Sequence, residues 1–437
     1  MKTHTHIWCL LFCWSSILLS QEVTLTDWNE FEKEFAKEYR RLHLPNLSIS
    51  YLDNLELIQN KRTIDRQEIV FLKYKYALQT IDQTKLSQVQ ALDYALVAYE
   101  IDMNLLRIAL EKKWHTVKPK HISQEGLQHV PLGKEWYAYF LKRWIDVTVT
   151  PKELYQFGLS EIERAKKAMK AIQVASGMDS LTFQKYLQGN HFYYNDVDTI
   201  QHQFETYKKE IVPKLIGAFP KVNELQDVKI ERGRNEAYGQ VPAYYAEYDN
   251  TFYYNYFNTP FNTRQIAWIY LHEAIPGHHY QIKFENQLKR STIKELFSYN
   301  GYRESWAAYV EEIGNDFNAY TTIYDEYGKW EWDIIRSVRV AMDVGLNYYD
   351  WSDEKALAFW KQHIKGQDAI AMREINRIKQ WPAQVITYKY GANKILEWKR
   401  IIEAKLADGE PFPWLEFHTK ILQYGALPFS IMDTLLF

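Results

Sequence analysis

Cysteine is almost absent from this chain of 437 residues, and the two cysteines present, Cys9 and Cys13, both stand near its start. Removal of that leading segment leaves a chain without a thiol. This excludes disulfides, a cysteine nucleophile and thiolate metal ligands. An excess of basic charge is also missing, because 53 Lys and Arg stand against 55 Asp and Glu. Proteins that neutralise many phosphates need such an excess, so nucleic acid is not an expected partner.

Long apolar runs are missing as well, and without about 18 consecutive apolar residues no membrane span is expected. The longest apolar stretch of the N-terminal segment, Ile7 to Leu19, follows a positive Lys2 and ends before a plausible cleavage point at Ser20-Gln21. This pattern predicts a signal peptide over residues 1–20 and export to the bacterial periplasm or beyond. Lipid attachment at Cys13 is the weaker alternative, because the preceding Phe12 is bulky.

Aromatic residues are abundant, with 33 Tyr, 21 Phe and 15 Trp, and most of the chain has helical periodicity. Apolar residues recur at i, i+3, i+4 and i+7 over 87–114, and Thr150-Pro151 is typical of a helix start. The pattern changes at Asp227. Residues 227–233 predict a strand and 241–258 a hairpin, before helical periodicity returns at Asn262. We therefore expect a mainly α protein with one small β-sheet, in which 21–226 and 227–437 form one continuous fold.

The segment "YLHEAIPGHHYQ" (270–281) sets three histidines and a glutamate around a Pro-Gly pair. A second zinc ligand on a regular helix stands at i+4, one turn after the first. Pro276 occupies that position and removes a helical hydrogen bond, so the helix expected over 263–275 should bulge or kink there. A bulge of two residues brings His278 to the place of the i+4 ligand. His279 shares the azimuth of His272 but lies farther along the axis, and it stays the alternative ligand.

A third ligand is expected from the next helix, "GYRESWAAYVEEIGND" (301–316). Glu304 supplies a carboxylate there, and Glu311 lies on the same face as a partner that orients a ligand. Two histidines, one glutamate and an open position form a catalytic zinc composition, since structural sites are closed by four protein ligands. Glu273, next to His272, is the expected general base. In the alternative interpretation the histidines are hydrogen-bonded core residues that hold no metal.

Four motifs in this chain resemble the DUF885 family of bacterial proteins: "LHEAIPGHHYQ", "YRESWAAYVEE", "INRIKQWPAQVITYKYGANKI" and "FHTKILQYGALPFSIM". The family is similar to helical gluzincin metallopeptidases, although its function is largely unassigned. The resemblance implies a zincin-like gluzincin architecture with a deep cleft and one Zn²⁺. The helical half over 21–226 would form a wall of the cleft, and 227–437 would bind the metal. Ser305 departs from the family, which usually has glycine there.

The C-terminal motifs suggest further site residues. On a helix expected over 373–394, Arg377, Gln384, Tyr388 and Gly391 fall near one face. Helical gluzincins stabilise the oxyanion with a downstream Tyr or His, which makes Tyr388 the expected donor. Arg377 is the candidate for holding a substrate carboxylate. His418 in "EFHTKIL" either approaches the site or is a buried, hydrogen-bonded histidine.

These features together predict an exported zinc hydrolase that cleaves peptide or other amide bonds. An edge strand of the hairpin would pair with extended substrate. The cleft would be lined by four tyrosines of the hairpin: Tyr244, Tyr245, Tyr253 and Tyr254. A metal-dependent amidase or esterase acting on a small molecule would use the same catalytic residues. A third alternative is a binding protein that keeps the fold without chemistry, and the intact Glu273 beside two histidines argues against it.

Overall fold

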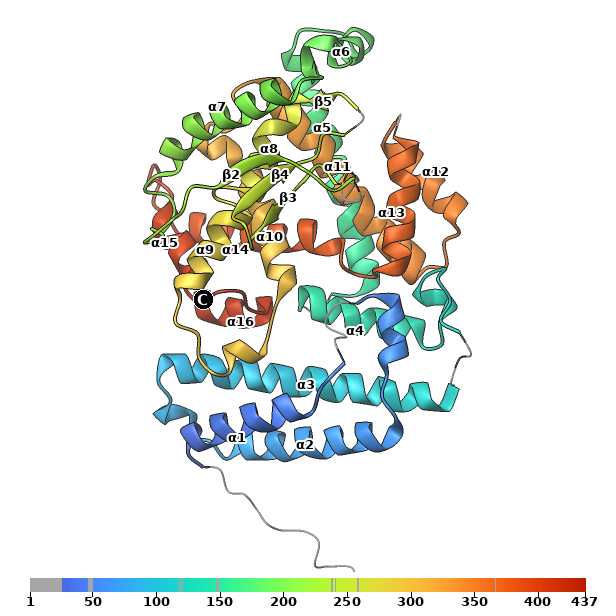
Figure 1. The fold of residues 1–437 in the computed structure, drawn as a ribbon, viewed down its shortest axis with the longest axis vertical. Coiled ribbons are helices and arrows are strands. Elements are labelled where there is room, and N and C mark those ends of the chain that lie inside the picture. The colour runs from blue at the N-terminus through green and yellow to red at the C-terminus, as the bar shows by residue number, and fades with distance from the viewer. Residues whose placement is uncertain are drawn as a thin grey trace, which may run out of the picture.

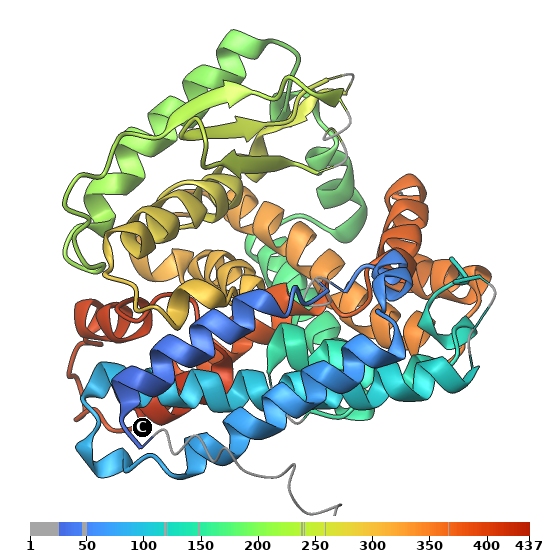
Figure 2. The same cartoon turned by 60° about the horizontal axis from the view of Figure 1, so that its bottom comes forward.

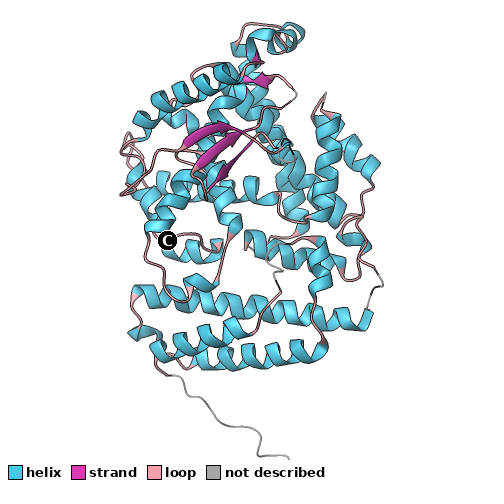
Figure 3. Cartoon of the chain, viewed as in Figure 1, coloured by secondary structure: helices cyan, strands magenta, loops and turns pink. Residues whose placement is uncertain are grey.

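The computed structural model describes residues 26–45, 50–117, 119, 121–146, 149–236, 239, 241–257, 259–365 and 367–437. The expected signal peptide, with Cys9 and Cys13, lies outside these residues. The described chain is mainly helical with small sheets, as predicted (Figure 3). None of its described helices combines the length and the apolar composition needed to cross a membrane.

The first part of the chain supplies seven of the described helices: α1 (Trp28–Arg41), α2 (Lys61–Gln79), α3 (Gln88–Val117), α4 (Gly133–Ile145), α5 (Pro151–Ala175), α6 (Ser180–Leu187) and α7 (Val197–Leu215). Helices α1, α2 and α3 pack side by side at the end of the molecule opposite α6 (Figures 1 and 2). The start of α5 is as predicted, since Thr150 and Glu153 form a reciprocal capping box. Such a box satisfies two backbone N–H groups that the first helical turn leaves without partners.

A three-stranded sheet stands where the sequence changes its pattern. Its strands are β2 (Lys229–Arg232), β3 (Ala243–Ala246) and β4 (Thr251–Tyr254), in the order β2-β4-β3. β3 and β4 form the predicted antiparallel hairpin, and β2 runs parallel to β4. Within the described residues β3 is therefore an edge strand. A second antiparallel pair, β1 (Tyr193–Tyr194) with β5 (Phe261–Asn262), was not predicted, because strands of two residues show no periodicity.

The second part of the chain returns to helices: α8 (Ile266–Glu273), α9 (His278–Gln287), α10 (Asn300–Glu312), α11 (Ile323–Asn347), α12 (Asp353–His363), α13 (Asp368–Gln380), α14 (Ala392–Glu403), α15 (Trp414–Leu422) and α16 (Phe429–Leu436). Helix α7 contacts β2 and α8, while α8 contacts the edge strand β3 (Figure 2). α8 also packs against α10 and α11. It is thus held between the sheet and the two helices that complete the site.

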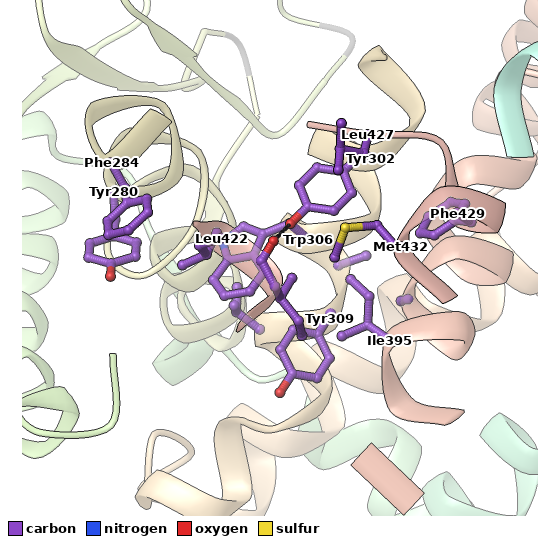
Figure 4. Packing of buried hydrophobic residues seen from close by; sticks show 14 of the residues in the cluster. Tyr280, Phe284, Tyr302, Trp306, Tyr309, Ile395, Leu422, Leu427, Phe429 and Met432 are labelled. Carbon is purple, nitrogen blue, oxygen red and sulfur yellow. Dashed lines mark hydrogen bonds between the residues drawn. The ribbon is translucent and has the colours of Figure 1, made fainter. Parts of the chain in front are cut away.

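Helix α10 has two opposite faces with different roles. Tyr302, Trp306 and Tyr309 are buried among residues of α9, α14, α15 and α16 (Figure 4). At about 100° per residue these three side chains share one face, and Glu304 and Glu311 point the opposite way. The aromatic face anchors α10 in the core, and this anchoring presents the two carboxylates to α8.

The helix expected over 373–394 is interrupted, so this prediction was wrong in its continuity. α13 ends at Gln380, and Ala383 follows with a left-handed φ of 67°. The Ala383 N–H donates to the buried Asp343 carboxylate at 3.0 Å. A π-helical turn over Thr387–Gly391 then leads into α14. The break changes the direction of the chain between Arg377 and Tyr388.

Candidate active site

The helical backbone is interrupted between α8 and α9, at the Pro-Gly pair. A helix bulge was predicted, whereas the structure ends α8 at Glu273 and begins α9 at His278. A Cβ atom on Gly277 would lie 1.9 Å from the carbonyl oxygen of His272, so only glycine permits this close approach. The indole of Trp306 donates to the Pro276 carbonyl at 2.8 Å, which ties the break to α10. The break brings the rings of His272 and His278 to a centroid distance of 4.8 Å.

Three potential metal ligands meet at this break. One ligand atom each from His272, His278 and Glu304 lie within 4.8 Å of one another. Glu304 Oε2 is 3.9 Å from His272 Nε2 and 3.6 Å from His278 Nε2. Bonds of 2.0–2.2 Å at a tetrahedral angle place neighbouring ligand atoms roughly 3.3–3.6 Å apart. Small side-chain movements therefore suffice for these three atoms to hold one zinc-sized ion.

Glu311 orients the first of these histidines. Its Oε1 accepts from Nδ1 of His272 at 2.6 Å, and its Oε2 accepts from Nη1 of Arg336, also at 2.6 Å. Because Nδ1 carries the proton, the lone pair of His272 is on Nε2, which faces Glu304. Although burial alone would raise the pKa of Glu311, Arg336 and His272 hold it below its usual value. A carboxylate behind a ligating histidine fixes its tautomer in this way.

The other two ligand candidates share a charge interaction. Burial acts against ionisation of Glu304, yet the nearby His278 lowers its pKa to about 2. Burial likewise disfavours a charged His278, but Glu304 and then Glu273 raise its pKa. Glu304 is thus ionised at neutral pH, as a metal ligand must be.

His279 points away from this cluster. Its Nε2 lies 3.0 Å from the carbonyl oxygen of Gln226, and its Nδ1 lies 3.2 Å from the hydroxyl of Tyr245. Burial lowers the pKa of His279 to about 4, so the ring is neutral at pH 7. The structure therefore groups His278, and not its neighbour, with His272 and Glu304. His279 instead ties α9 to the edge strand.

Glu273 faces the same cavity of about 270 Å³ as the three ligand candidates. The side chain is largely buried, yet it has no hydrogen-bond or ion-pair partner among the described residues. The cavity is lined by residues of the strand β3 and of α8, α10, α11, α13 and the turn that follows: Ala243, Tyr244, Tyr245, Trp268, Ile269, Glu304, Trp332, Arg336, Arg339, Arg373, Arg377 and Tyr388, among others. An unpaired carboxylate in this position is available to accept a proton.

Tyr388 reaches the cavity from the π-helical turn. Its ring stacks near His272, with 6.5 Å between the ring centroids. Its oxygen accepts from Nε2 of Gln384 at 3.1 Å and from Nη2 of Arg377 at 3.4 Å. With both lone pairs approached by donors, the phenolic O–H is free to donate into the cavity. Arg377, Gln384 and Tyr388 do converge, although through a broken helix.

Three predicted site residues, and Gly391 of the same C-terminal motifs, lie elsewhere. Tyr253 and Tyr254 are on the central strand β4, where Tyr253 donates to Asp249 and Tyr254 stacks on Phe204 in the core. His418 is fully buried and stacks on Phe219, and burial lowers its pKa to about 3. Gly391 packs against Ser305, whose Oγ would lie 1.7 Å from a Cβ at that position. These residues support the fold and do not line the cavity.

Sequence reasoning missed two arginines of α11 and the carboxylate of Glu374 on α13. Arg336 and Arg339 are 4% and 3% exposed, within the apolar stretch "IIRSVRVAM". Buried arginines are costly unless paired or functional, so two of them inside an apolar helix were a signal that could have been used. Their acidic partners, Glu311 and Glu374, are far away in sequence, and only the fold brings these pairs together.

The fold and site define a mainly helical protein with a cluster of two histidines and one glutamate open to a small cavity. The chain belongs to the DUF885 family, described as bacterial proteins of unknown function, whose match spans residues 103–436. No curated protein matches the sequence.

Two solved structures share the fold. One is described as a "putative lipoprotein" from Colwellia psychrerythraea, with 21% identity, a TM-score of 0.66, and coverage of 94% of this chain and 74% of the other. The second, described as a "putative lipoprotein of unknown function" from Shewanella oneidensis, has 15% identity, a TM-score of 0.70, and coverage of 94% and 99%. At these identities the likeness is one of fold alone.

Proposed function

We propose that this protein is an exported, metal-dependent hydrolase with a zincin-like site, and that it cleaves peptide or amide bonds. The observation that carries the proposal is the open cluster of His272, His278 and Glu304 facing one cavity with an unpaired Glu273. Three protein ligands with room for a fourth are the composition of catalytic zinc sites.

The donor set suits zinc in its chemistry as well as its spacing. Neutral imidazole nitrogens and a carboxylate oxygen are common zinc ligands, and Glu311 orients one of the imidazoles from behind. A zinc ion bound there would lower the pKa of a coordinated water to about 7 and polarise a carbonyl oxygen.

The roles of the protein's own groups follow from their positions. Glu273 accepts the proton of the attacking water and returns it to the leaving nitrogen. Tyr388 donates its O–H to the oxygen on which negative charge develops, because Gln384 and Arg377 already donate to its own oxygen. The edge strand β3, whose Tyr244 and Tyr245 line the cavity, offers backbone groups to an extended substrate.

An amidase or esterase acting on a small molecule is the second candidate, and the small volume of the cavity supports it. About 270 Å³ is slightly below the usual range of ligand pockets, roughly 300–1,000 Å³. Glu273 is a largely buried carboxylate that stands beside the ligand candidates without a partner among the described residues. A binding protein that performs no chemistry would not need such a group.

Export is the part of the proposal that depends on the N-terminal segment. The apolar stretch after Lys2 is typical of a signal peptide, and both structural relatives are described with the words "putative lipoprotein". Mass spectrometry of the mature N-terminus distinguishes cleavage before Gln21 from lipid attachment at Cys13.

The proposal is tested by metal analysis together with cleavage. We expect the purified protein to hold close to one zinc per chain and to cleave members of a peptide library, with cleavage stopped by a chelator and restored by zinc. His278→Ala should lose the metal, whereas the matched variant His279→Ala should retain it. Full zinc occupancy in His278→Ala would refute the ligand assignment. If peptides stay intact while small amides or esters are cleaved, the second candidate replaces the first.

A further inference from the structure

One buried carboxylate, that of Glu374, is shared by three arginines that line the cavity. Glu374 Oε2 lies 2.9 Å from Nε of Arg339 and 3.9 Å from Nη1 of Arg377, and Glu374 Oε1 lies 3.1 Å from Nη2 of Arg373. Glu374 is 1% exposed, and no second carboxylate pairs with Arg339 or Arg377 in the described part of the chain. Arg339 and Arg377 therefore share a single buried carboxylate.

Arg339 is the most unusual member of this cluster. It is 3% exposed and lines the cavity, and although its Nε lies 2.9 Å from Glu374 Oε2, neither of these two atoms has a hydrogen-bond partner among the described residues. A buried guanidinium offers five N–H donors in a planar fork, and leaving them unused costs free energy. Such a group is suited to a ligand with two acceptor oxygens in one plane.

Two tryptophans hold the guanidinium planes in position. Trp268 and Trp332 stack with 5.3 Å between ring centroids. Arg336 lies over the first ring at 5.6 Å, and Arg339 lies over the second at 5.3 Å. Stacking on an indole face restricts a guanidinium without using its donors. Arg336 donates from Nη1 to Glu311. Arg339 instead forms an ion pair with Glu374 and lines the cavity.

The arginine cluster lies close to the proposed reaction centre. Arg377 donates to the oxygen of Tyr388, whose ring stacks near the first metal-ligand candidate, His272. One tyrosine ring thus separates the guanidiniums from the ligands. One residue of extended peptide spans about 3.3–3.6 Å, so a carboxylate on the arginines would be only one or two residues from the reacting carbonyl.

We propose that this cluster of Arg339, Arg373 and Arg377 binds the free C-terminal carboxylate of a short peptide substrate. The inference rests on the proposed hydrolase function and narrows it to release of the last one or two residues. In the reaction, the water oxygen bonds to the carbonyl carbon and the C–N bond breaks. The leaving nitrogen takes a proton, so one peptide and one water give an acid and an amine. The carboxylate on the arginines stays unchanged and positions the substrate.

The test compares acetylated peptides of one sequence that differ only in ending as a free acid or as an amide. We expect kcat/KM to favour the free acid by ~10–100-fold, the range for a hydrogen-bonded charged group. Arg339→Gln should lower this preference toward one, mainly through KM, and Arg339→Lys should retain part of it. Lys361→Gln removes a positive charge from the exposed face of α12 and should leave the preference intact. Arg373→Gln, at a more exposed position, is the second variant if Arg339→Gln fails to fold.

Binding without turnover separates this inference from the proposed function. Calorimetry on Glu273→Gln protein should show a free-acid acetyl-dipeptide binding at least 10-fold more tightly than its amide, and Arg339→Gln in that background should remove the difference. A peptide with an amidated C-terminal aspartate tests a side-chain carboxylate as the source. Equal cleavage of acid and amide by the wild-type protein overturns the inference and leaves the hydrolase standing. Tight, Arg339-dependent binding without any cleavage supports the carboxylate site and refutes the hydrolase.

Discussion

Two buried glutamates pair with arginines that line the cavity, and their surroundings differ. Glu311 accepts one hydrogen bond from Arg336 and one from His272, so a single cation and a neutral N–H satisfy both oxygens. Glu374 faces three guanidiniums instead. The first arrangement is complete without any further charge. In the second, Arg339 and Arg377 share the one carboxylate, so their two positive charges face a single negative charge.

This difference separates a positioning role from a binding role. A satisfied carboxylate behind a histidine orients that histidine and keeps its outer nitrogen basic. A buried cluster with excess positive charge is costly by itself and becomes favourable once an anion completes it. The side of the cavity near Glu311 is therefore suited to chemistry, and the side near Glu374 is suited to substrate selection. Substitutions on each side test this division.

The largest effect is expected for Glu273→Gln, on the side of the ligands. Glutamine keeps the shape of the side chain but cannot accept a proton from water. We expect turnover to fall by ~10²–10⁴-fold, the usual contribution of general acid–base catalysis, while metal content and fold are retained. Steady-state kinetics with zinc analysis and circular dichroism provide the measurement. Undiminished turnover would show that another group acts as the base.

The next largest effect is expected for Tyr388→Phe, since Tyr388 stands between the two sides. Loss of the phenolic O–H should lower kcat by ~10²–10³-fold, as removal of one oxyanion donor does, with a smaller change in KM. The preference for a free C-terminal acid should persist, because the arginines remain. A loss confined to KM would instead assign Tyr388 to substrate binding.

The sequence predicted which ligand candidates lie close together better than it predicted the grouping of the arginines. His272, Glu273 and His278 lie within one short segment, so their spacing and the proline between them were readable. Glu304 and Glu311 share one helix face, and helical periodicity was enough to pair them. The direction of His279 depends on Gln226 and Tyr245, which belong to another segment and a strand, and no local pattern encodes that contact.

The arginine side depends on contacts between segments that are distant in sequence. Arg339 on α11 meets Glu374 on α13, and Trp332 meets Trp268 on α8. Tyr254 is a residue whose predicted role was wrong because of such distant contacts. The tyrosine-rich hairpin suggested that Tyr254 lines a cleft. Only the strand order reveals that β4 is central and that Tyr254 faces the core. Periodicity indicates which side chains share a face, but the packing partner of that face is set by tertiary structure.

A smaller effect is expected when Glu311 and Glu374 are replaced in parallel. Glu311→Gln presents an amide where His272 and Arg336 both donate, so one of them faces another N–H group. We expect zinc affinity to fall by ~10–100-fold, the usual effect of removing the partner of a ligating histidine. Glu374→Gln is the matched control and should keep zinc affinity unchanged. Competition with a fluorescent chelator measures both constants, and an equal loss in the two variants would contradict the division between the sides.

The smallest effect concerns His418, which lies outside both sides and has no carboxylate partner among the described residues. Its Nε2 is 3.0 Å from the hydroxyl of Tyr309 and its Nδ1 is 2.6 Å from the carbonyl oxygen of Ala218, an arrangement that suits the neutral ring. Burial lowers its pKa from about 6.5 in the unfolded chain to about 3 in the folded protein. Between these values the unfolded state binds one more proton, so stability is complete above pH 6.5 and falls as the pH decreases.

Each pH unit in that window should cost about 1.4 kcal/mol of unfolding free energy. Urea unfolding of metal-free protein at pH 7 and at pH 5.5 gives the loss, and the same pair of measurements on His418→Gln removes the contribution of every other group, including His279. We expect the wild-type protein to lose about 1 kcal/mol more than the variant. Equal losses would mean that His418 gains a proton in the folded state without opening the core. In that case Ala218 and Tyr309 would tolerate a charged ring, and the arrangement around His418 would have more freedom than that around the two glutamates.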